Sequence, residues 1–300
     1  MSLRIIYFRQ ILLTVFLIIC YQNEVYSQET DISTENQSGM FVGISLGPSQ
    51  SHIMNVGTLS VSELLSFKKN SFFGSVEFGY FFSEYIGLSS GISFISYRTK
   101  LTLDTYQIKF NSTDLENESY ERRVSGSGIK EVHNIDLLSI PFCINLRSPL
   151  NETIGFFLQT GVNMAVPISK NYKSNGTFTY KGYYSAYNVL LENLPAYGFP
   201  TKKSIETNGE LELKPFGFNA TVSAGFDFLI KNNIQIAVAA CYDKSLSNIS
   251  EYSSPDKFQL SSDPEKINSF MGGSSKATAQ SMGLKIIFRY YLKLKKVESL

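Results

Sequence analysis

The chain has 300 residues, a formal net charge of +1 at pH 7, and only 18% charged residues. This near-neutral balance gives no reason to expect nucleic acid as a partner, because binding to a phosphate backbone depends on an excess of basic residues. Aromatic residues reach 14% without any Trp, which suits membrane-interface girdles but also any large β-protein.

The N-terminus has the features of an export signal. Arg4 and Arg9 give it positive charge, and the run 11–19 is almost entirely apolar. We expect cleavage before Gln28, because small or tolerated residues stand at the −1 and −3 positions. The apolar run is short for a transmembrane helix, which needs about 20 apolar residues. Lipoprotein processing at Cys20 is less favoured, because a large isoleucine precedes the cysteine.

The rest of the chain contains eight runs in which residues of two kinds alternate. A period of two is typical of β-strands whose two faces meet different surroundings. No other long apolar run follows the export signal, so the sequence predicts no membrane-spanning helix. The expected strands are Gly39–Gly47, Ser71–Phe82, Ile86–Arg98, Val132–Arg147, Thr153–Val166, Pro215–Ile230, Asn233–Asp243 and Thr278–Leu292.

The connections between these runs alternate strictly in length. Outer-membrane barrels have this order, because their short turns face the periplasm and their long loops face outside. A soluble sandwich or lipocalin has no physical reason to keep it. The short connections are 83–85, 148–152 and 231–232, and the long ones are 48–70, 99–131, 167–214 and 244–277.

The two faces of each expected strand also differ. In Pro215–Ile230 one face is mostly large and apolar, and the other is crowded with Gly, Ser, Thr and Asn. A large apolar face suits lipid, and small polar residues suit a narrow interior. The ring must close, because an open edge in hydrocarbon would leave unpaired backbone groups. The sequence therefore predicts an all-β fold, an eight-stranded antiparallel transmembrane β-barrel with long extracellular loops and short periplasmic turns.

This architecture divides the chain into four parts and places it in the outer membrane of a Gram-negative bacterium. Outer-membrane lipid is the expected surrounding, and we expect a monomer. The parts are a signal peptide at 1–27, a short N-terminal periplasmic segment at 28–38, the barrel at 39–292 and a basic C-terminal tail at 293–300.

Four stretches carry a resemblance to a known family. They are GMFVG at 39–43, GSVEFGYFFSEYIGLSSGISF at 74–94, IDLLSIPFCINLR at 135–147 and FFLQTGVNMAVPISK at 156–170. With them the chain resembles the PorT-like outer-membrane β-barrels of Bacteroidetes-type bacteria over about residues 39–292. The resemblance implies the architecture, and the founding member of that family is tied to a protein secretion system. A barrel signature alone does not carry that role to this chain.

The C-terminus departs from the usual barrel pattern. Outer-membrane barrels often end on an aromatic residue that the insertion machinery reads. Here Tyr291 is followed by LKLKKVESL, so a basic tail extends past the last strand. The departure concerns the insertion signal and leaves the barrel prediction unchanged.

Charged residues of both signs fall on the expected inward faces. Side chains nearly fill the interior of an eight-stranded barrel, and buried charges must pair or be desolvated at large cost. We interpret these residues as an ion-paired plug, with a lined conduction path as the alternative. They are Glu77, Asp136, Asp227, Lys285 and Arg289.

Aromatic residues gather near the expected short turns, where a periplasmic girdle should lie. Ordinary strand aromatics are the alternative interpretation. The girdle candidates are Tyr80, Phe82, Tyr85, Phe156, Phe226, Phe228 and Tyr290.

The long connection 167–214 contains many tyrosines and lysines. Loops longer than about 15 residues are usually functional or disordered, and Tyr is a good contact residue. A surface for a protein or glycan partner is one interpretation, and strand extensions above the membrane would explain the same residues. The contact candidates are Tyr172, Tyr180, Tyr183, Tyr184 and Tyr187.

Few residues suggest chemistry. His133, Ser139 and Asp136 are candidates for a rim-active lipid hydrolase. Asp136 is expected inside, whereas Ser139 is expected on the other face, so the triad is geometrically awkward. Cys143 and Cys241 are expected as free thiols in mid-strand, although a pairing depends on a Cα distance below about 7 Å that sequence leaves open.

The remaining motifs are equally unspecific. No Cys or His spacing suggests zinc, and GSVEFG at 74–79 lacks the following helix of a nucleotide loop. We therefore expect no catalytic, cofactor or metal residues. The favoured function is a non-enzymatic barrel that binds, anchors or assists export through its loops. The alternative is a rim-active lipid hydrolase or a small pore.

Overall fold

The computed structural model describes most of the expected barrel. The described residues are 39–56, 64–114, 116–231, 233–251, 258–274 and 276–292. The expected signal peptide, the segment 28–38 and the tail 293–300 lie outside them. Among the described residues, no helix is long and apolar enough to cross a membrane.

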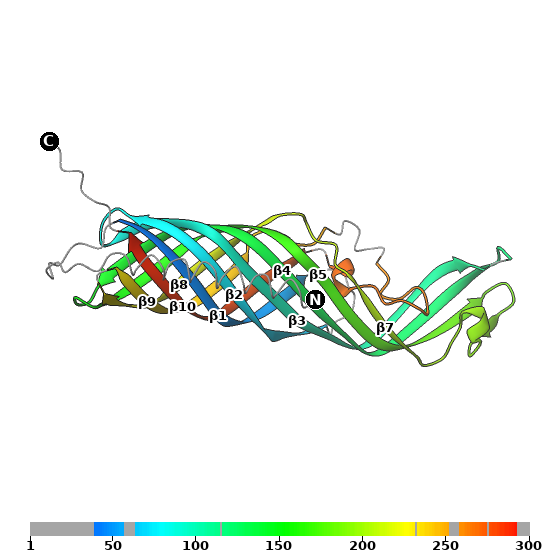
Figure 1. Ribbon diagram of the computed structural model, residues 1–300. Coiled ribbons are helices and arrows are strands. Elements are labelled where there is room, and N and C mark those ends of the chain that lie inside the picture. Colours follow the sequence, from blue (N-terminus) through cyan, green and yellow to red (C-terminus); the bar gives the residue numbers. More distant parts are fainter. Residues whose placement is uncertain are drawn as a thin grey trace, which may run out of the picture. The chain divides into compact units, whose positions relative to one another are not determined.

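Eight antiparallel strands close into a ring, in which β10 pairs with β1 and β4 pairs with β5 (Figure 1). This confirms the eight-stranded all-β fold and the expected chain order. The ring strands are β1 (Gly39–Val56), β2 (Leu65–Phe81), β3 (Ile86–Thr113), β4 (Ser119–Pro149), β5 (Ile154–Tyr184), β8 (Gly217–Lys231), β9 (Ile234–Ser245) and β10 (Lys276–Leu292).

The two faces of the ring differ as the alternation predicts. Large apolar side chains point outward and are exposed, among them Phe78, Ile92, Phe142 and Leu284. Small and polar residues point inward, and some positions have no room for a side chain. A Cβ added to Gly161 would lie 2.1 Å from the carbonyl oxygen of Phe142 in the neighbouring strand. The outward face therefore suits hydrocarbon, and the interior is narrow.

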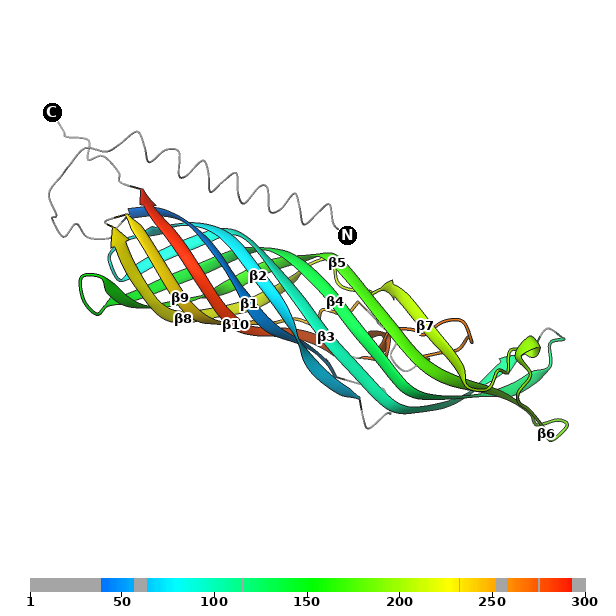
Figure 2. The ribbon, with the colours of Figure 1, turned by 60° about the horizontal axis from the view of Figure 1, so that its bottom comes forward.

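Three strands continue far beyond the ring. β3 has 28 residues and β4 and β5 have 31 each, whereas a membrane crossing needs about 9–11. Two further strands, β6 (Val189–Leu191) and β7 (Lys203–Glu210), pair with β5. Figure 2 shows β6 at the far end of this sheet. We call the part of the sheet beyond the ring the extension. It consists of residues 103–113 of β3, 119–129 of β4 and 172–184 of β5, together with β6 and β7.

The extension corrects the expectation that 99–131 and 167–214 are loops. β3 and β4 form one long hairpin whose tip lies at 114–118. The connection 167–214 consists mainly of β5, β6 and β7, with the short 3-10 helix η1 (Pro195–Tyr197) between β6 and β7. The alternative of strands that extend above the membrane therefore describes these segments.

The extension has a hydrophobic core of its own. Buried side chains from its strands, such as Tyr106, Ile129 and Phe178, pack together. Leu260, Ile267 and Phe270, from the connection between β9 and β10, cover them. This second core makes the extension a packed sheet and distinguishes it from a set of hairpins.

Candidate functional site

The lumen is filled by aromatic side chains at the end that carries the short turns. Phe41, Phe81 and Tyr291 are buried there, with ring centroids 5.5 to 6.2 Å apart. They belong to β1, β2 and β10, three adjacent strands of the ring. This cluster forms the first layer of the interior.

Two buried ion pairs form the next layer. Arg289 Nε lies 2.8 Å from Glu77 Oε1, and both side chains are almost fully buried. Arg147 Nη2 lies 2.8 Å from Asp227 Oδ1, and Arg147 Nε is 3.0 Å from both carboxylate oxygens. Charges in a narrow interior therefore pair, as the plug interpretation requires.

The sequence interpretation missed Arg147 as the partner of Asp227. Arg147 closes the expected fourth strand and shares the inward parity of Cys143 and Asn145. That parity is a signal that could have identified it. The expected inward position of Asp136 instead places Arg147 on the outward face, because the two residues differ in parity.

The structure corrects the place of Asp136. Ile135 and Ser139 are buried on the inward face of β4, so Asp136 lies on the outward face. There it pairs with Arg98 of β3, with 2.7 Å between Oδ1 and Nη2. The expected inward position was wrong because the parity of β4 had been assigned the other way round.

Lys285 is the remaining member of the predicted set, and it does face the lumen. Its Nζ donates to Gln159 Oε1 at 2.7 Å. The Nε2 of Gln159 donates to Glu77 Oε2 at 2.9 Å and to Asn145 Oδ1 at 3.0 Å. Gln159 therefore joins Lys285 to the ion-paired layer, and among the described residues Lys285 forms no ion pair of its own.

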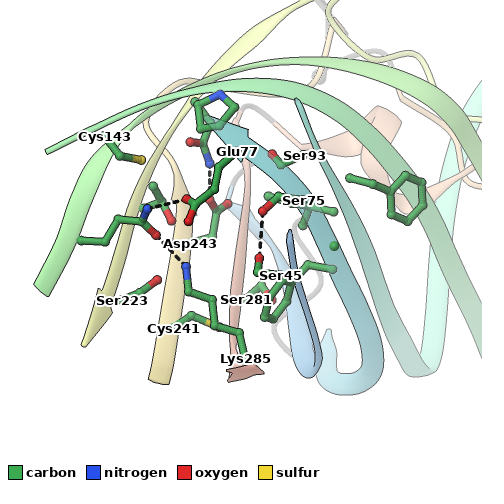
Figure 3. Close-up of a pocket in the computed structure, with 18 of the residues that line it drawn as sticks. Ser45, Ser75, Glu77, Ser93, Cys143, Ser223, Cys241, Asp243, Ser281 and Lys285 are labelled. Carbon is green, nitrogen blue, oxygen red and sulfur yellow. Dashed lines mark hydrogen bonds between the residues drawn. The ribbon is translucent and has the colours of Figure 1, made fainter. Parts of the chain in front are cut away.

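A cavity of about 80 Å³, lined by serine hydroxyls, charged groups and apolar side chains, lies next to this network. Figure 3 shows Lys285 and Glu77 at its wall, with Ser45 and Ser75 joined by a hydrogen bond of 2.8 Å. Cys143 and Cys241 also line the cavity, and both are free thiols. Its volume and its hydroxyl lining suit a small cluster of water molecules.

Polar and then apolar residues fill the lumen on the other side of the cavity. Asp243 accepts hydrogen bonds from Tyr97, Asn163 and Asn219. Beyond them lies a cluster of buried apolar residues. It comprises Ile53, Ile95, Tyr97, Ile135, Tyr172, Leu211, Leu213, Met271, Ala277 and Ala279.

The 3-10 helix η3 (Phe270–Gly273) belongs to this apolar filling and is held by a buried polar cluster. Glu131 accepts from Ser269 Oγ at 2.7 Å and from the backbone N–H of Phe270 at 3.0 Å. His133 Nε2 contacts the same carboxylate and lies 3.3 Å from Ser269 Oγ. The cluster fastens the β9–β10 connection into the mouth of the barrel.

The hydrolase candidates do not assemble. Ser139 Oγ is 2.6 Å from Ser93 Oγ, and Asp136 is on the opposite face of β4 from His133. The Ser269, His133 and Glu131 cluster also differs from a catalytic triad. In a triad the acid and the nucleophile use different ring nitrogens, whereas both partners here approach Nε2, and all three residues are buried.

The predicted contact tyrosines separate into two groups. Tyr172 and Tyr180 are buried, and Tyr180 has no exposed surface. Their assignment to a contact surface was wrong, because β5 turns these residues into the core. Tyr183 and Tyr184 are half-buried, and Tyr187 is 61% exposed.

Another cluster in the extension was missed entirely. The Arg122 guanidinium lies 5.3 Å from the Tyr180 ring centroid and 5.8 Å from that of Phe199. Tyr120 stacks on Tyr184 at 5.2 Å. Contacts between cations and rings in this arrangement stiffen the end of the sheet. No periodic pattern indicates this cluster, since Phe199 lies in an irregular segment.

Exposed apolar residues surround β6 at the far end of the extension. A single acidic residue, Glu192, interrupts them, and it pairs with Lys181. Exposed apolar patches often mark interaction sites. We call this set the tip, and its exposed members are Tyr187, Val189, Leu190, Leu194 and Tyr197.

A model of the outer membrane protein beta-barrel domain family matches residues 26–251. The chain belongs to this family. The family and the ring of strands place it in the outer membrane of a Gram-negative bacterium. No curated protein shows significant similarity to the sequence.

Several solved outer-membrane barrels are similar in fold. Ail, the attachment invasion locus protein of Yersinia pestis, is 12% identical, with 84% of this chain and 99% of that chain covered and a TM-score of 0.30. OprG from Pseudomonas aeruginosa is 12% identical, with 86% and 99% covered and a TM-score of 0.37. The outer membrane protease OmpT from Escherichia coli is 10% identical, with 88% and 99% covered and a TM-score of 0.30. Similarities this remote concern the fold alone.

In an outer-membrane barrel the short turns face the periplasm, so the extension lies outside the cell. All seven girdle candidates lie on the outward face or in the turns at the periplasmic end. The ring centroids of Tyr80 and Phe82 are 5.3 Å apart, and those of Phe156 and Phe226 are 5.8 Å apart. This is the position that an interface girdle requires.

The turn between β3 and β4, which is separate from the tip, has its own electrostatic arrangement. Backbone N–H groups, led by that of Glu118, hold the pKa of Asp114 below its usual range. Burial and then the hydrogen bond to Asp114 raise the pKa of Tyr184 to about 12. Tyr187 donates to Glu118 Oε1 at 2.7 Å. Two tyrosines of the β5–β6 hairpin are therefore bonded to the neighbouring hairpin.

Proposed function

We propose that this protein is a non-enzymatic outer-membrane barrel whose lumen is closed, and that it binds a protein or glycan partner through its extracellular extension. The observation that carries the proposal is the continuation of β3, β4 and β5 into a packed sheet with its own core. A sheet ordered in this way can hold a contact surface in a fixed position outside the membrane. Preorganisation lowers the entropic cost of binding.

The layers of the lumen support an anchoring role over conduction. The aromatic cluster at Phe41, the Glu77 and Arg289 pair and the apolar filling around Met271 occupy successive levels of the interior. The small cavity lies between the last two of these. A pore would instead require a continuous hydrated path along the barrel axis.

The tip is the surface that best suits a partner. It combines exposed Tyr with aliphatic residues; aromatic residues are enriched in protein interfaces, and the centres of interfaces are more apolar than their rims. The carboxylates of Asp114, Glu116 and Glu118 lie on the adjacent hairpin. A partner with an apolar site bordered by basic groups would complement this surface.

The resemblance to PorT-like barrels of Bacteroidetes-type bacteria fits the same proposal. A closed barrel with an extracellular binding sheet could assist an export system as a docking partner. Conduction of cargo through this lumen is not part of the proposal.

A photo-crosslinking experiment on intact cells tests the function. A benzophenone amino acid would replace Leu190 at the tip, and the same residue at Lys203 in β7 would serve as the matched control. We expect one discrete adduct from position 190 and none from 203. Adducts of equal yield at both positions, or none at position 190, would contradict binding at the tip.

Planar bilayers test the closed lumen separately. We expect the wild-type protein to give no stable single-channel currents, because three layers block the axis. Reproducible currents would support the small pore instead.

A further inference from the structure

Three lysines approach one another on the outward face of the barrel wall. Lys100 of β3 and Lys173 of β5 are the lateral neighbours of Val132 in β4. Lys130 lies two residues before Val132 in β4 and therefore shares its outward face. Lys130 is the diagonal neighbour of both Lys100 and Lys173, and diagonal neighbours on one face of a sheet are about 7–8 Å apart. The three ammonium groups can therefore meet over the outward side chain of Val132.

Their positive charge is only partly balanced. Lys173 pairs with Glu206 at 2.5 Å, but both side chains are 55% exposed, and such pairs are weak. Within the described part of the chain, Lys100 and Lys130 form no ion pair. Like charges gathered on one face of a sheet repel one another, and an anion bound between them would remove that repulsion.

The neighbouring residues suit a sugar. Phe67 of β2 is the lateral neighbour of Lys100 and is 48% exposed. Asn134 of β4 and Asn171 of β5 are lateral neighbours on the same outward face, two residues nearer the membrane than Val132 and Lys173. The aromatic ring can cover a sugar face, and the amides can bond hydroxyl groups. Cations, amides and one exposed ring together fit a phosphorylated or carboxylated saccharide.

The height of the cluster identifies the source of such a saccharide. Toward the extension, Leu138 is the last exposed apolar residue on the outward face of β4, and Val132 lies six residues nearer the extension. At about 3.3 Å per residue and a tilt of about 40°, the cluster lies about 15 Å above the apolar band. The polar interface of a phospholipid leaflet is only about 5–8 Å deep. Phospholipid phosphates would therefore lie below the lysines, whereas the sugars of a glycolipid would reach them.

We propose that Lys100, Lys130 and Lys173, together with Phe67, bind the anionic sugar head group of a glycolipid in the outer leaflet. The site is on the outward face of the sheet above the apolar band, and it does not involve the tip. The proposal depends on the outer-membrane location and is independent of the proposed partner binding, so either can fail alone.

The test uses the purified full-length protein and a lipid A that carries two anionic core sugars. Binding would be measured by native mass spectrometry for the wild type and the double variant Lys100→Gln with Lys130→Gln. Both side chains point away from the interior, so the barrel should still fold, which heat-modifiable migration on gels can verify. We expect at least tenfold weaker binding for the double variant. Lys244→Gln, an isolated outward lysine on β9, should change binding less than twofold.

Two further probes separate the sources of anionic charge. Phosphatidylglycerol and inorganic phosphate should each bind at least tenfold more weakly than the core-bearing lipid. Phe67→Ala should weaken binding of that lipid by about threefold or more and leave the response to inorganic phosphate unchanged. Equal binding of all three probes, or unchanged glycolipid binding by the double variant, would overturn the proposal.

Discussion

The ring and the extension use the same strands for opposite arrangements of polarity. In the ring, β3, β4 and β5 turn large apolar residues such as Phe142 outward and polar residues such as Gln159 inward. In the extension, the same strands turn Phe178 and Tyr180 inward and expose polar residues. Lipid requires the first arrangement and water the second. One continuous sheet can therefore pass from hydrocarbon into water because its alternation reverses at the boundary.

In β5 a local irregularity makes the reversal, whereas in β4 the inward set changes from Ser139 and Asn145 to Ile135 and Ile129 without a change of parity. In β5 the register shifts between the pairs Leu137 with Pro167 and Asp136 with Ser169, which leaves Ile168 as an extra residue. One added residue moves every later side chain to the other face. In β4, Gly128 has a φ of 60°, a conformation that favours glycine, and the register shifts there as well. The two regions consequently have different cores, and each should respond to its own substitutions.

The largest expected effect lies in the ring. Arg289→Ala removes one partner of a buried ion pair and leaves Glu77 as an uncompensated buried charge, which costs about 3–5 kcal/mol. Urea unfolding of the reconstituted barrel measures the change. Lys203→Ala, at an exposed position of the extension, is the matched control and should change stability by less than about 0.5 kcal/mol. Equal midpoints for the two variants would show that the lumen is hydrated.

A slightly smaller effect should be confined to the extension. Tyr180→Ala removes a fully buried ring together with a hydrogen bond of 2.6 Å to Ser261. Loss of a large buried side chain costs about 3 kcal/mol or more, and here the loss should appear as faster hydrogen exchange in β4, β5 and β7. Heat-modifiable migration of the barrel should be unchanged. Tyr183→Ala, on the opposite face of β5, should have a much smaller effect, and a barrel that unfolds with the extension would contradict two separate cores.

The connection between ring and extension can be weakened on its own. Glu131→Gln exchanges the charged acceptor that holds Ser269 and the backbone of Phe270 for a neutral amide. Hydrogen bonds to charged groups contribute about 1.5–3 kcal/mol, so η3 should exchange its amide hydrogens faster by a corresponding factor. Ser185→Ala, in the distant β5–β6 turn, should leave η3 unchanged. Unaltered protection of η3 in Glu131→Gln would mean that apolar packing alone holds the segment.

The sequence predicts the ring better than the extension for a physical reason. Lipid demands a large apolar outward face, so strands such as β8 and β10 carry a strong period of two, and the need to pair charges brings Glu77 and Arg289 together. Above the membrane the outward face is polar and the inward face is apolar, and the alternation Tyr172, Ser174, Gly176, Phe178 starts after Pro167 and the bulge. A single uninterrupted parity could not be followed across that point.

Pairing partners are the other feature that the sequence left open. The alternation indicates which face Asp227 occupies, but the partner depends on register and on the shear of the closed ring. Arg147 is 80 residues away and meets Asp227 across β5. In the same way, the sequence could not show that Glu131, His133 and Ser269 gather around η3.

The smallest expected effect is a pH dependence at the hairpin tip, where the extension is most exposed. The pKa of Asp114 is lower in the folded protein than in the unfolded chain. Its ionised form therefore stabilises the β3–β4 turn fully above about pH 4, and this stabilisation is lost as the pH falls through the lowered pKa. The pKa of Tyr184 is raised to about 12, so its contribution is complete below about pH 10 and is lost as the pH rises toward the folded value. Hydrogen exchange of residues 114–118 should therefore be slowest, after correction for the intrinsic rate, between these limits. Asp114→Asn should flatten the acid side of the profile and leave the ring unaffected, whereas an acid limb that persists in this variant would assign the titration to another carboxylate.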